Sequence, residues 1–336
     1  MGPHGRGWAK QVIPQIKAVD LVGYVDTDPY SLDALREVAN VPAEKCFESM
    51  KEAIAATQPQ AALITTALPS HVAVARAALD AGLHVLIEKP FAPTLESAQQ
   101  LVDMAADRRL VLMVSQNYRF FPAPRAIASL VRQAKLGPLH EVSIDFRRYS
   151  PGQGRHGIEE QPLLVDMSIH HFDLLRLILN RQPERVYCEA WNPEWATFGG
   201  PSVAVASIAF EGGVVVSYRG SWVTAGPVTP WAGEWRMEFQ HGEVFWTSRE
   251  DDGVLRDRVV ARSRDGKTRA LTLPEVRWTG PSGTLTEFAN AIDSGREPET
   301  SGRENLGTIA LVEAAVESAT RRELVTISRP GKVLAI

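Results

Sequence analysis

The chain has 336 residues, of which 44% are hydrophobic and 23% are charged, and its formal net charge is −4. This length allows two domains, and the small negative charge argues against a nucleic acid or an anionic membrane as a partner. Only Cys46 and Cys188 are present, which excludes a disulfide scaffold and fits a reducing compartment such as the cytoplasm. No apolar run reaches the length of a membrane span, and no signal-peptide pattern is visible.

The chain opens with glycines that lead into a helix predicted over about residues 7–18. Gly2 and Gly5 have the spacing of the last two glycines of G-x-G-x-x-G. In that motif one glycine lets the backbone approach a pyrophosphate, and the next lets a helix pack on a strand. The first glycine and its strand would lie upstream of Met1, so we expect a misplaced start codon or a truncation. An ordinary loop is the alternative.

A strand is predicted over residues 21–26, and it ends at Asp26. An acid at this place can accept hydrogen bonds from both ribose hydroxyls of an adenosine, and its charge opposes a 2′-phosphate. NAD is therefore expected as cofactor in preference to NADP. Asp26 can also cap a turn with Asp28 and Pro29, and both interpretations can hold together.

Helices and strands then alternate as far as about residue 136. Helices are predicted over residues 31–39, 49–57, 73–83 and 94–108, and strands over residues 61–66, 85–87 and 110–114. Thr94 is expected to be the N-cap of its helix. This alternation predicts an α/β domain with a parallel sheet that helices cover on both faces.

The strand over residues 85–87 ends in an abrupt change of character, because Glu88, Lys89 and Pro90 follow three apolar residues directly. A parallel strand buried on both faces is continuously apolar, and its carboxyl end opens into the crevice where doubly wound sheets bind ligands. Pro90 ends the strand and stiffens the turn. The pattern therefore places Lys89 at the strand end where active-site residues of such sheets usually lie. The alternative is a solvated lysine that pairs with Glu88.

The second half of the chain has strand patterns in place of this alternation. Apolar and polar side chains alternate over residues 141–148 and 235–240, and further strands are predicted over residues 202–210, 214–222, 259–263 and 268–273. Turn residues between neighbouring segments predict hairpins. Two closing helices are predicted over residues 283–294 and 303–321. These patterns predict a large, mainly antiparallel sheet with an apolar face that the closing helices do not cover.

One helix is predicted early in this half, over residues 163–173. Asp166 and His170 are four residues apart and share a face of that helix. A neutral histidine can take a proton from a hydroxyl, and a carboxylate one turn away can orient it or bind a second hydroxyl. The alternatives are a histidine packed at an interface and a metal site that uses Asp166, His170 and either Asp173 or His171.

Together these features resemble the Gfo/Idh/MocA oxidoreductase family, whose members include glucose–fructose oxidoreductase and inositol dehydrogenase. The specific part is the run Ala-Gly-Leu-His-Val-Leu-Ile-Glu-Lys-Pro over residues 81–90, together with the Asp166-x-x-x-His170 spacing. The resemblance covers essentially the whole chain. Further matching segments are residues 2–7, Asp26, the Tyr-Arg-Phe run over residues 118–120, and residues 319–322.

The resemblance implies a Rossmann NAD(P)-binding domain over residues 1–122, with its first strand absent. It also implies an α+β domain with a large, mainly antiparallel open sheet over residues 123–336. The implied activity is hydride transfer between the nicotinamide and a secondary alcohol of a sugar, inositol or related polyol. Lys89 would contact the reacting hydroxyl and the nicotinamide region. His170 would be the general base, and Asp166 would hold the substrate and tune His170.

The same resemblance implies a wider set of binding residues and no metal. Cofactor contacts are expected from Gly2, Pro3, His4, Gly5, Asp26, Thr66, His71, Glu88, Lys89 and Asn117. Substrate contacts are expected from Lys89, Tyr118, Arg119, Asp166 and His170. A homo-oligomer, dimer or tetramer, is expected because an uncovered apolar sheet face is usually a subunit interface.

Two features depart from the family pattern. Many relatives have a glycine-rich run before the Asp-x-x-x-His helix, whereas residues 159–162 here read Glu-Glu-Gln-Pro, so the edge of the substrate pocket is expected to differ. The absence of the first strand would expose neighbouring strands of the sheet. The alternative to an active enzyme is therefore a non-catalytic or cofactor-impaired relative that binds a sugar or nucleotide.

Overall fold

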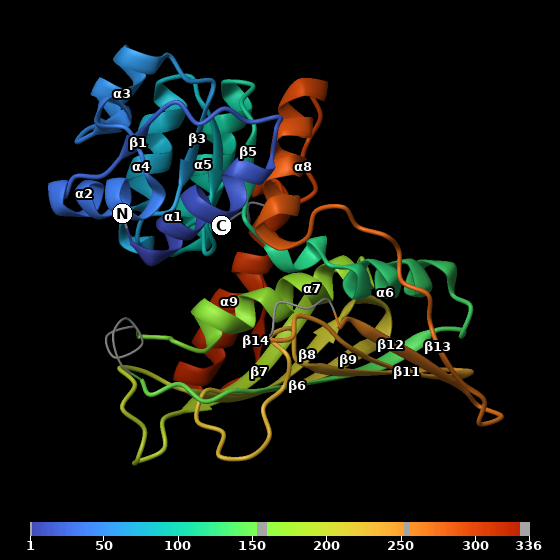
Figure 1. Cartoon of the computed structure of the whole chain (residues 1–336). Helices are drawn as coiled ribbons and strands as arrows, with labels where there is room; N and C mark the ends of the chain where they lie inside the picture. The colour runs from blue at the N-terminus through green and yellow to red at the C-terminus, as the bar shows by residue number, and fades with distance from the viewer. Residues whose placement is uncertain (1, 153–159, 252–255, 330–336) are drawn as a thin grey trace. The chain divides into compact units, whose positions relative to one another are not determined.

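The computed structural model describes residues 2–152, 160–251 and 256–329 (Figure 1). Contacts divide the chain into two compact units. Unit 1 comprises Met1–Asn117 and Arg277–Asn305, and unit 2 comprises Tyr118–Val276 and Leu306–Ile336. The domain boundary at residue 122 stays a prediction, while the contacts assign residues 277–305 to unit 1. No helix in the described ranges is long and apolar enough to cross a membrane.

Unit 1 contains a parallel sheet in two hydrogen-bonded pieces. One piece pairs β1 (Tyr24–Val25) with β2 (Cys46–Phe47), and the other has the order β3 (Ala61–Ile64), β4 (His84–Ile87) and β5 (Leu112–Val114). All pairings between these described strands are parallel, which confirms the α/β prediction for this half. β1 is much shorter than the strand predicted over residues 21–26. It is paired along one edge only, so fewer ladder hydrogen bonds hold its ends extended.

The helices of unit 1 alternate with these strands in the predicted order. They are α2 (Pro29–Ala39), α3 (Met50–Thr57), α4 (Leu68–Asp80) and α5 (Leu95–Asp107), followed much later by α8 (Gly280–Ser294), and a 3-10 turn spans Ala43–Lys45. Thr94 caps α5 through a capping box with Ser97, as predicted for Thr94. α4 begins earlier than the predicted residue 73, because Pro69 suits the first turn of a helix, where its missing N–H is not needed.

The N-terminal segment is helical from Pro3 to Gln15. It runs through α1 (Pro3–Gly7), a π-helical turn (Trp8–Val12) and a 3-10 turn (Ile13–Gln15). The helix predicted over residues 7–18 therefore starts earlier, and Gly5 lies within it, not in a loop. The cause is again a proline in the first turn, with Gly2 as the extended N-cap residue.

The return of residues 277–305 to unit 1 completes the edge of β5. The Val114 N–H donates to the Thr300 carbonyl oxygen (2.8 Å), and the Thr300 hydroxyl donates to the Val114 carbonyl oxygen (2.7 Å). Met113 and Ser301 also form an antiparallel bridge. The backbone groups along this edge of a buried strand are thereby paired.

Unit 2 is built on a large mixed sheet with the order β13-β12-β11-β10-β6-β9-β8-β7-β14. β6 and β9 pair in parallel, and the other neighbouring pairs among the described strands are antiparallel. This confirms the predicted large, mainly antiparallel sheet. The strand bounds are β6 (Leu139–Arg147), β7 (Pro183–Trp191), β8 (Val203–Phe210), β9 (Val214–Ser221), β10 (Glu234–Phe239), β11 (Gly242–Thr247), β12 (Arg258–Ser263), β13 (Thr268–Ala270) and β14 (Val325–Thr326). β7, β11 and β14 were not predicted.

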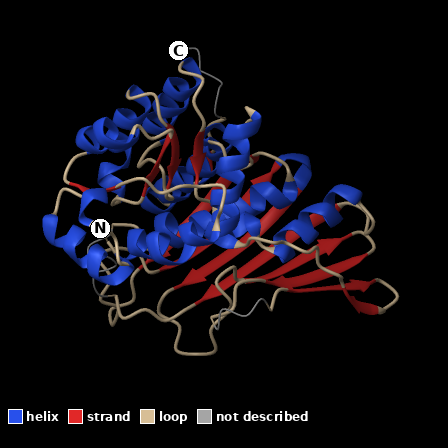
Figure 2. Ribbon diagram, turned by 45° about the horizontal axis from the view of Figure 1, so that its top comes forward, coloured by secondary structure: helices blue, strands red, loops and turns tan. Residues whose placement is uncertain are grey.

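Helices cover the apolar face of this sheet. They are α6 (Pro122–Gln133), α7 (Ile169–Leu179) and α9 (Gly302–Arg321), and Figures 1 and 2 show α6 and α7 lying along that face. Phe172 of α7 packs edge-on against Tyr218 of β9, and the Ser318 hydroxyl of α9 accepts from the Cys188 N–H of β7. The prediction that the apolar face lacks helical cover is therefore wrong. α6, which sits on it, lies just before the first predicted strand of this half, where no helix was predicted.

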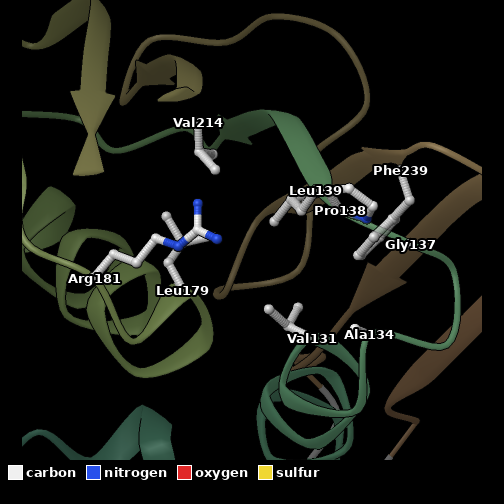
Figure 3. Close-up of a pocket in the computed structure, with 9 residues that line it drawn as sticks. All are labelled: Val131, Ala134, Gly137, Pro138, Leu139, Leu179, Arg181, Val214 and Phe239. Carbon is white, nitrogen blue, oxygen red and sulfur yellow. The ribbon is translucent and has the colours of Figure 1, made fainter. Parts of the chain in front are cut away.

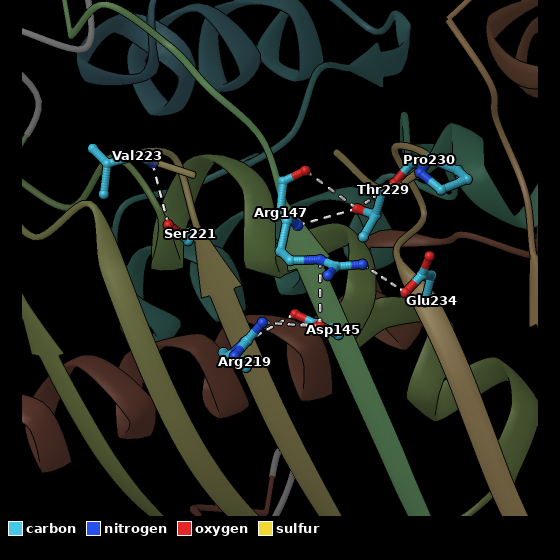
Figure 4. A network of polar contacts seen from close by, with 8 residues as sticks. All are labelled: Asp145, Arg147, Arg219, Ser221, Val223, Thr229, Pro230 and Glu234. Atoms are coloured by element: carbon cyan, nitrogen blue, oxygen red, sulfur yellow. Dashed lines mark hydrogen bonds and ion pairs between the residues drawn. The ribbon is translucent and has the colours of Figure 1, made fainter. Parts of the chain in front are cut away.

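The face without helices carries charged side chains. Asp145 of β6 accepts from Arg219 of β9 (3.0 and 3.1 Å), and Arg147 donates to Glu234 of β10 (2.8 Å) (Figure 4). The Arg147 backbone N–H also donates to the Thr229 hydroxyl (3.1 Å). These cross-strand ion pairs keep the outer face of a broad sheet polar at its centre.

Candidate functional site

Glu88 is the buried anchor of the turn that follows β4. It is 4% exposed, and its Oε1 accepts from Trp8 Nε1 (2.8 Å) and lies 3.0 Å from His4 Nε2. Its Oε2 accepts from the Lys89 backbone N–H (3.2 Å). Burial alone would raise the pKa of Glu88, but hydrogen bonds from His4 and Trp8 and the charges of His4 and Lys89 lower it below its usual value. The carboxylate therefore fixes the N-terminal helix and the turn that carries Lys89.

His71 joins the turns after β3 and β4. The ring is 2% exposed, with Nδ1 2.7 Å from the Pro90 carbonyl oxygen and Nε2 2.9 Å from the Thr66 carbonyl oxygen. Burial lowers its pKa, and the two carbonyl contacts oppose that shift. His71 thus supports the backbone around Lys89, while the Thr66 side chain is exposed. Their predicted cofactor contacts stay predictions.

Three consecutive polar residues at the carboxyl end of β5 bury side-chain polar atoms that have no hydrogen-bond partner among the described residues. The Ser115 hydroxyl, both amide atoms of Gln116 and the Asn117 amide oxygen have no hydrogen-bond partner within the described part of the chain. Gln116 is 1% exposed. Asn117 was predicted as a binding residue, but Ser115 and Gln116 were missed. The signal was the same one that marks Glu88 and Lys89, a polar run directly after a buried parallel strand.

Asp26 lies at the end of β1, as predicted, and is half-buried. Its Oδ1 accepts from the Asp28 backbone N–H (3.0 Å). Asp28 in turn caps α2, accepting from the Tyr30 N–H (3.1 Å) and the Ser31 hydroxyl (2.8 Å). The interpretation of Asp26 as a turn residue is confirmed, and its role toward a ribose stays a prediction.

Unit 2 holds the candidate base in an aromatic stack. The rings of His170 and Tyr118 lie 4.0 Å apart and within 8° of parallel, and they are 5% and 4% exposed. Arg249 lies over the Tyr118 ring, with its guanidinium carbon 4.0 Å from the ring centre. Burial raises the pKa of the Tyr118 hydroxyl above its usual value, although the charge of Arg249 opposes the shift. The imidazole is thus held in one plane by packing.

Arg119, the residue after Tyr118, forms a buried ion pair. Its guanidinium donates to both carboxylate oxygens of Asp173 (2.6 and 2.7 Å), and the two side chains are 3% and 1% exposed. The Thr308 hydroxyl donates to Asp173 (3.0 Å) and accepts from Arg176 (3.2 Å). A bidentate pair with a further hydrogen bond offsets the cost of burying both charges. It joins the segment before α6 to α7 and α9.

His171 belongs to the core of unit 2. Nδ1 lies 3.1 Å from the Tyr218 hydroxyl, and Nε2 lies 3.1 Å from the Trp231 carbonyl oxygen. Burial lowers its pKa to about 4. Asp173 is paired with Arg119, and His171 contacts Tyr218 and Trp231, so both residues proposed as the third metal ligand are engaged elsewhere. Within the residues described, no group of three or more His, Cys, Asp or Glu side chains could hold a metal ion.

Asp166 lies in a π-helical turn, Leu164–Ser168, that leads directly into α7. The predicted helix over residues 163–173 therefore begins in a wider form, and His170 lies in the first turn of the regular helix. Asp166 is half-buried. Of the segment at residues 159–162, Glu159 is outside the described residues.

A small apolar cavity lies elsewhere in unit 2 (Figure 3). Val131 and Ala134 at the end of α6 line it with Leu179 at the end of α7 and Val214 of β9, and the Arg181 side chain extends beside them. Tyr118 and His170 are at the opposite ends of these two helices. The cavity is therefore separate from the aromatic stack, and it offers few polar groups for a sugar.

The polar groups at the strand ends of unit 1 fit a ligand with amide, ribose and phosphate groups. Buried polar atoms without protein partners are normally satisfied by a ligand or water. Ligands of parallel sheets bind outside the carboxyl ends of the strands. The orphaned amide of Gln116 follows β5, Lys89 follows β4 and Asp26 follows β1, so all three lie at such ends.

Two family models match the chain. The model described as an oxidoreductase family with an NAD-binding Rossmann fold matches residues 4–116, and the model described as the GFO/IDH/MocA C-terminal domain matches residues 125–243. The first match lies within unit 1 and the second within unit 2. Each unit is thus matched by a model of the same family.

Known proteins match over nearly the full length. The uncharacterised protein y4oX of Sinorhizobium fredii is 30% identical over 344 residues, which cover 99% of this chain and 93% of that protein. D-apiose dehydrogenase of Paraburkholderia graminis is 26% identical over 325 residues, covering 90% and 82%. The crystal structure of an inositol dehydrogenase homologue from Azotobacter vinelandii, complexed with NAD+, matches with a TM-score of 0.77 at 20% identity, covering 90% and 88%. At that identity it shows a shared fold.

Proposed function

Because the chain belongs to the Gfo/Idh/MocA family of oxidoreductases, enzymes with an NAD-binding Rossmann fold, we propose that it transfers a hydride between NAD and a secondary alcohol of a sugar, inositol or related polyol. The observation that carries the proposal is the stack of His170 on Tyr118, since a proton acceptor must be held in a fixed and nearly dry position. The sugar dehydrogenase among the relatives supports the substrate class. Family membership favours an enzyme over a non-catalytic relative.

In the proposed reaction, His170 accepts the proton of the substrate hydroxyl. The Lys89 ammonium donates a hydrogen bond to the same oxygen and stabilises the negative charge that develops there. Asp166 binds a second hydroxyl of the substrate and tunes His170. NAD, when bound, supplies the hydride chemistry.

Tyr118 and Arg119 act mainly by positioning in this proposal. Tyr118 fixes the plane of the imidazole by stacking. Arg119 fixes the Tyr118 backbone, because its guanidinium is held by Asp173. A direct contact of Arg119 with substrate stays a prediction, and its burial supports the positioning role instead.

The cofactor would be held by residues of unit 1. Asp26 accepts from the ribose hydroxyls, and the orphaned amides of Gln116 and Asn117 satisfy polar groups of the nicotinamide half. Glu88 and His71 act indirectly, through the backbone of the turn that carries Lys89. The contacts of Gly2, Pro3, His4, Gly5 and Thr66 with the cofactor stay predictions.

A substrate screen tests the proposed function. The purified protein is incubated with NAD and a panel of sugars, inositols and sugar acids, and NADH formation is followed by absorbance. We expect turnover of at least one panel member and much slower turnover by the His170→Ala variant. If NAD binds in calorimetry but no alcohol in the panel is oxidised and no matching ketone is reduced by NADH, the proposal fails.

We expect NAD to bind more tightly than NADP. Placing a 2′-phosphate beside Asp26, with Asp28 in the same turn, costs on the order of 1–3 kcal/mol through charge repulsion and a lost hydrogen bond. This corresponds to roughly 5- to 150-fold in Kd. Isothermal titration with each dinucleotide measures the ratio, and Asp26→Ser should reduce it. Tenfold tighter binding of NADP would contradict the prediction.

We expect Gln116→Leu to weaken NAD binding without destabilising the free protein. Leucine removes two buried polar atoms that have no partner in the described structure, so the free energy of unfolding should stay equal or rise. NAD affinity should fall about tenfold with the loss of roughly 1–1.5 kcal/mol of hydrogen bonding. Thermal unfolding with and without NAD gives both quantities. A large loss of stability without NAD would show that Gln116 is a structural residue.

We expect a homo-oligomer, but for a different reason from the uncovered apolar sheet face predicted from the sequence. The helix-free face of the large sheet places exposed Val205 and Val215 beside small serines such as Ser207 and Ser217. Small and apolar side chains beside the cross-strand ion pairs of this face suit packing against a second sheet. Light scattering at micromolar concentration should give a mass of at least a dimer, and a monomer mass would refute the prediction.

A further inference from the structure

Arg249 lies against the ring that holds the candidate base. Its guanidinium carbon is 4.0 Å from the centre of the Tyr118 ring and 5.4 Å from the centre of the Phe121 ring. The His170 ring is also 4.0 Å from the Tyr118 centre and nearly parallel to it. Two planar groups at that distance would overlap if they shared one face of the ring. His170 and Arg249 therefore cover opposite faces of Tyr118.

No acidic side chain in the described ranges forms an ion pair with the Arg249 guanidinium. Arg148 provides the contrast, because it lies 4.3 Å from the centre of the Trp231 ring and is also paired with Asp251 at 2.5 Å. Asp257 is coupled electrostatically to Arg249, but it accepts from the Arg249 backbone N–H and the Ser248 hydroxyl. The Arg249 guanidinium also hydrogen-bonds the Tyr118 hydroxyl, but no carboxylate of the described residues is paired with its charge.

The backbone at Arg249 is held in an unfavourable conformation. Its φ is 68°, in the left-handed region that residues with a Cβ rarely adopt. The surroundings impose it, since the N–H donates to Asp257 (3.4 Å) and the carbonyl accepts from the Trp231 N–H (2.9 Å). Backbone strain that is fixed in this way is concentrated at functional sites.

We propose that Arg249 binds a carboxylate of the substrate, and that the substrate class is therefore sugar acids, aldonic or uronic, in place of neutral sugars. The proposal rests on the proposed function, because it takes His170 as the base. The two separations of 4.0 Å keep the guanidinium and the imidazole within the length of a sugar acid. A single guanidinium offers two parallel N–H donors that match one carboxylate, in geometry and in charge.

The test compares substrates that differ in one negative charge. NAD reduction is measured with D-galacturonate, its methyl ester and D-galactose, and with D-glucuronate and D-glucose. For the wild type we expect kcat/KM to be at least about 30-fold higher for an acid than for its uncharged partner. Arg249→Gln should remove this preference mainly through KM, and Arg249→Lys should retain part of it. Arg125→Gln is the control, because Arg125 lies over the neighbouring Phe120 ring.

Three outcomes would overturn the proposal. In one, the wild type does not prefer acids over their methyl esters. In another, Arg249→Gln lowers kcat/KM equally for charged and neutral substrates, as a purely structural role predicts. A strong preference for D-glucose 6-phosphate that Arg249→Gln abolishes would assign the residue to a phosphate and overturn the carboxylate assignment.

A binding measurement separates failure of this inference from failure of the proposed oxidoreduction. Calorimetric titration of D-gluconate and D-galacturonate into the protein with NAD needs no turnover. If no compound is oxidised but both acids bind the wild type and bind Arg249→Gln at least about 30-fold more weakly, the carboxylate site stands and the proposed reaction falls. If turnover occurs but Arg249→Gln leaves acid binding unchanged, the reaction stands and the carboxylate site falls.

Discussion

Replacing His170 by Ala should lower kcat by roughly 10²–10⁴ while leaving NAD affinity nearly unchanged. The loss is expected because His170 is the proposed proton acceptor, and no other base would be positioned at the hydroxyl. His170→Phe separates the chemical role from packing, since a phenyl ring can keep the stack on Tyr118 but cannot take a proton. Both variants should lose kcat to a similar extent, as measured by NADH formation at saturating substrate.

The neighbouring His171 on the same helix is the matched control. Its ring nitrogens contact the Tyr218 hydroxyl and the Trp231 carbonyl oxygen, so His171→Leu leaves two buried groups unpaired. It should cost about 1–3 kcal/mol of stability and leave turnover per folded molecule intact. If instead His170→Phe keeps normal turnover and only shifts the melting temperature, His170 is a packed core histidine and the assignment of the base is wrong.

Replacing Lys89 by Ala should lower kcat by a similar factor, roughly 10²–10⁴, and should also raise the Kd for NAD. The ammonium is proposed to contact both the reacting oxygen and the nicotinamide region. The backbone of the turn should stay in place, because Glu88 holds the Lys89 N–H and is itself held by Trp8 and His4. Lys89→Met keeps most of the side-chain volume and should lose as much activity as Ala.

Two measurements make this prediction specific. NAD binding by calorimetry and kcat by NADH formation should both change in Lys89→Met, and neither should change in Lys51→Met, which alters an exposed lysine of α3. The catalytic role of Lys89 is refuted if Lys89→Met retains wild-type kcat. A change in Kd alone would restrict Lys89 to cofactor binding.

The parts of the fold that follow from local pattern were predictable. The apolar run of β4 followed by charges placed the Glu88 turn at a strand end, and Thr94 placed the start of α5. Turn residues between two predicted strands placed the hairpin of β8 and β9 to within a residue. β7 was missed because charged residues interrupt its alternation, and only pairing with β8 and β14 holds it extended.

The candidate site could be predicted as a set of residue types but not as a set of contacts. Glu88 was predicted to pair with Lys89 or to contact the cofactor, yet it binds Trp8 and His4 from the first helix. Arg119 was predicted to contact substrate, yet its guanidinium is held by Asp173. The partners of these long polar side chains lie far away in sequence. Residue spacing does not predict which of them folding brings within hydrogen-bond distance.

The sequence by itself determined the family, the NAD-binding class of the first half and the positions of Lys89, Asp166 and His170 on their elements, because each depends on residue order within one strand or helix. Only the tertiary structure decided that Tyr118 holds His170 by stacking, that the Gln116 amide is buried without a partner among the described residues, and that Arg249 lies over Tyr118. These features arise where a sheet, a helix and a loop from distant parts of the sequence pack together. The strength of these interactions depends on how deeply the groups are buried, and burial is defined only in the folded protein.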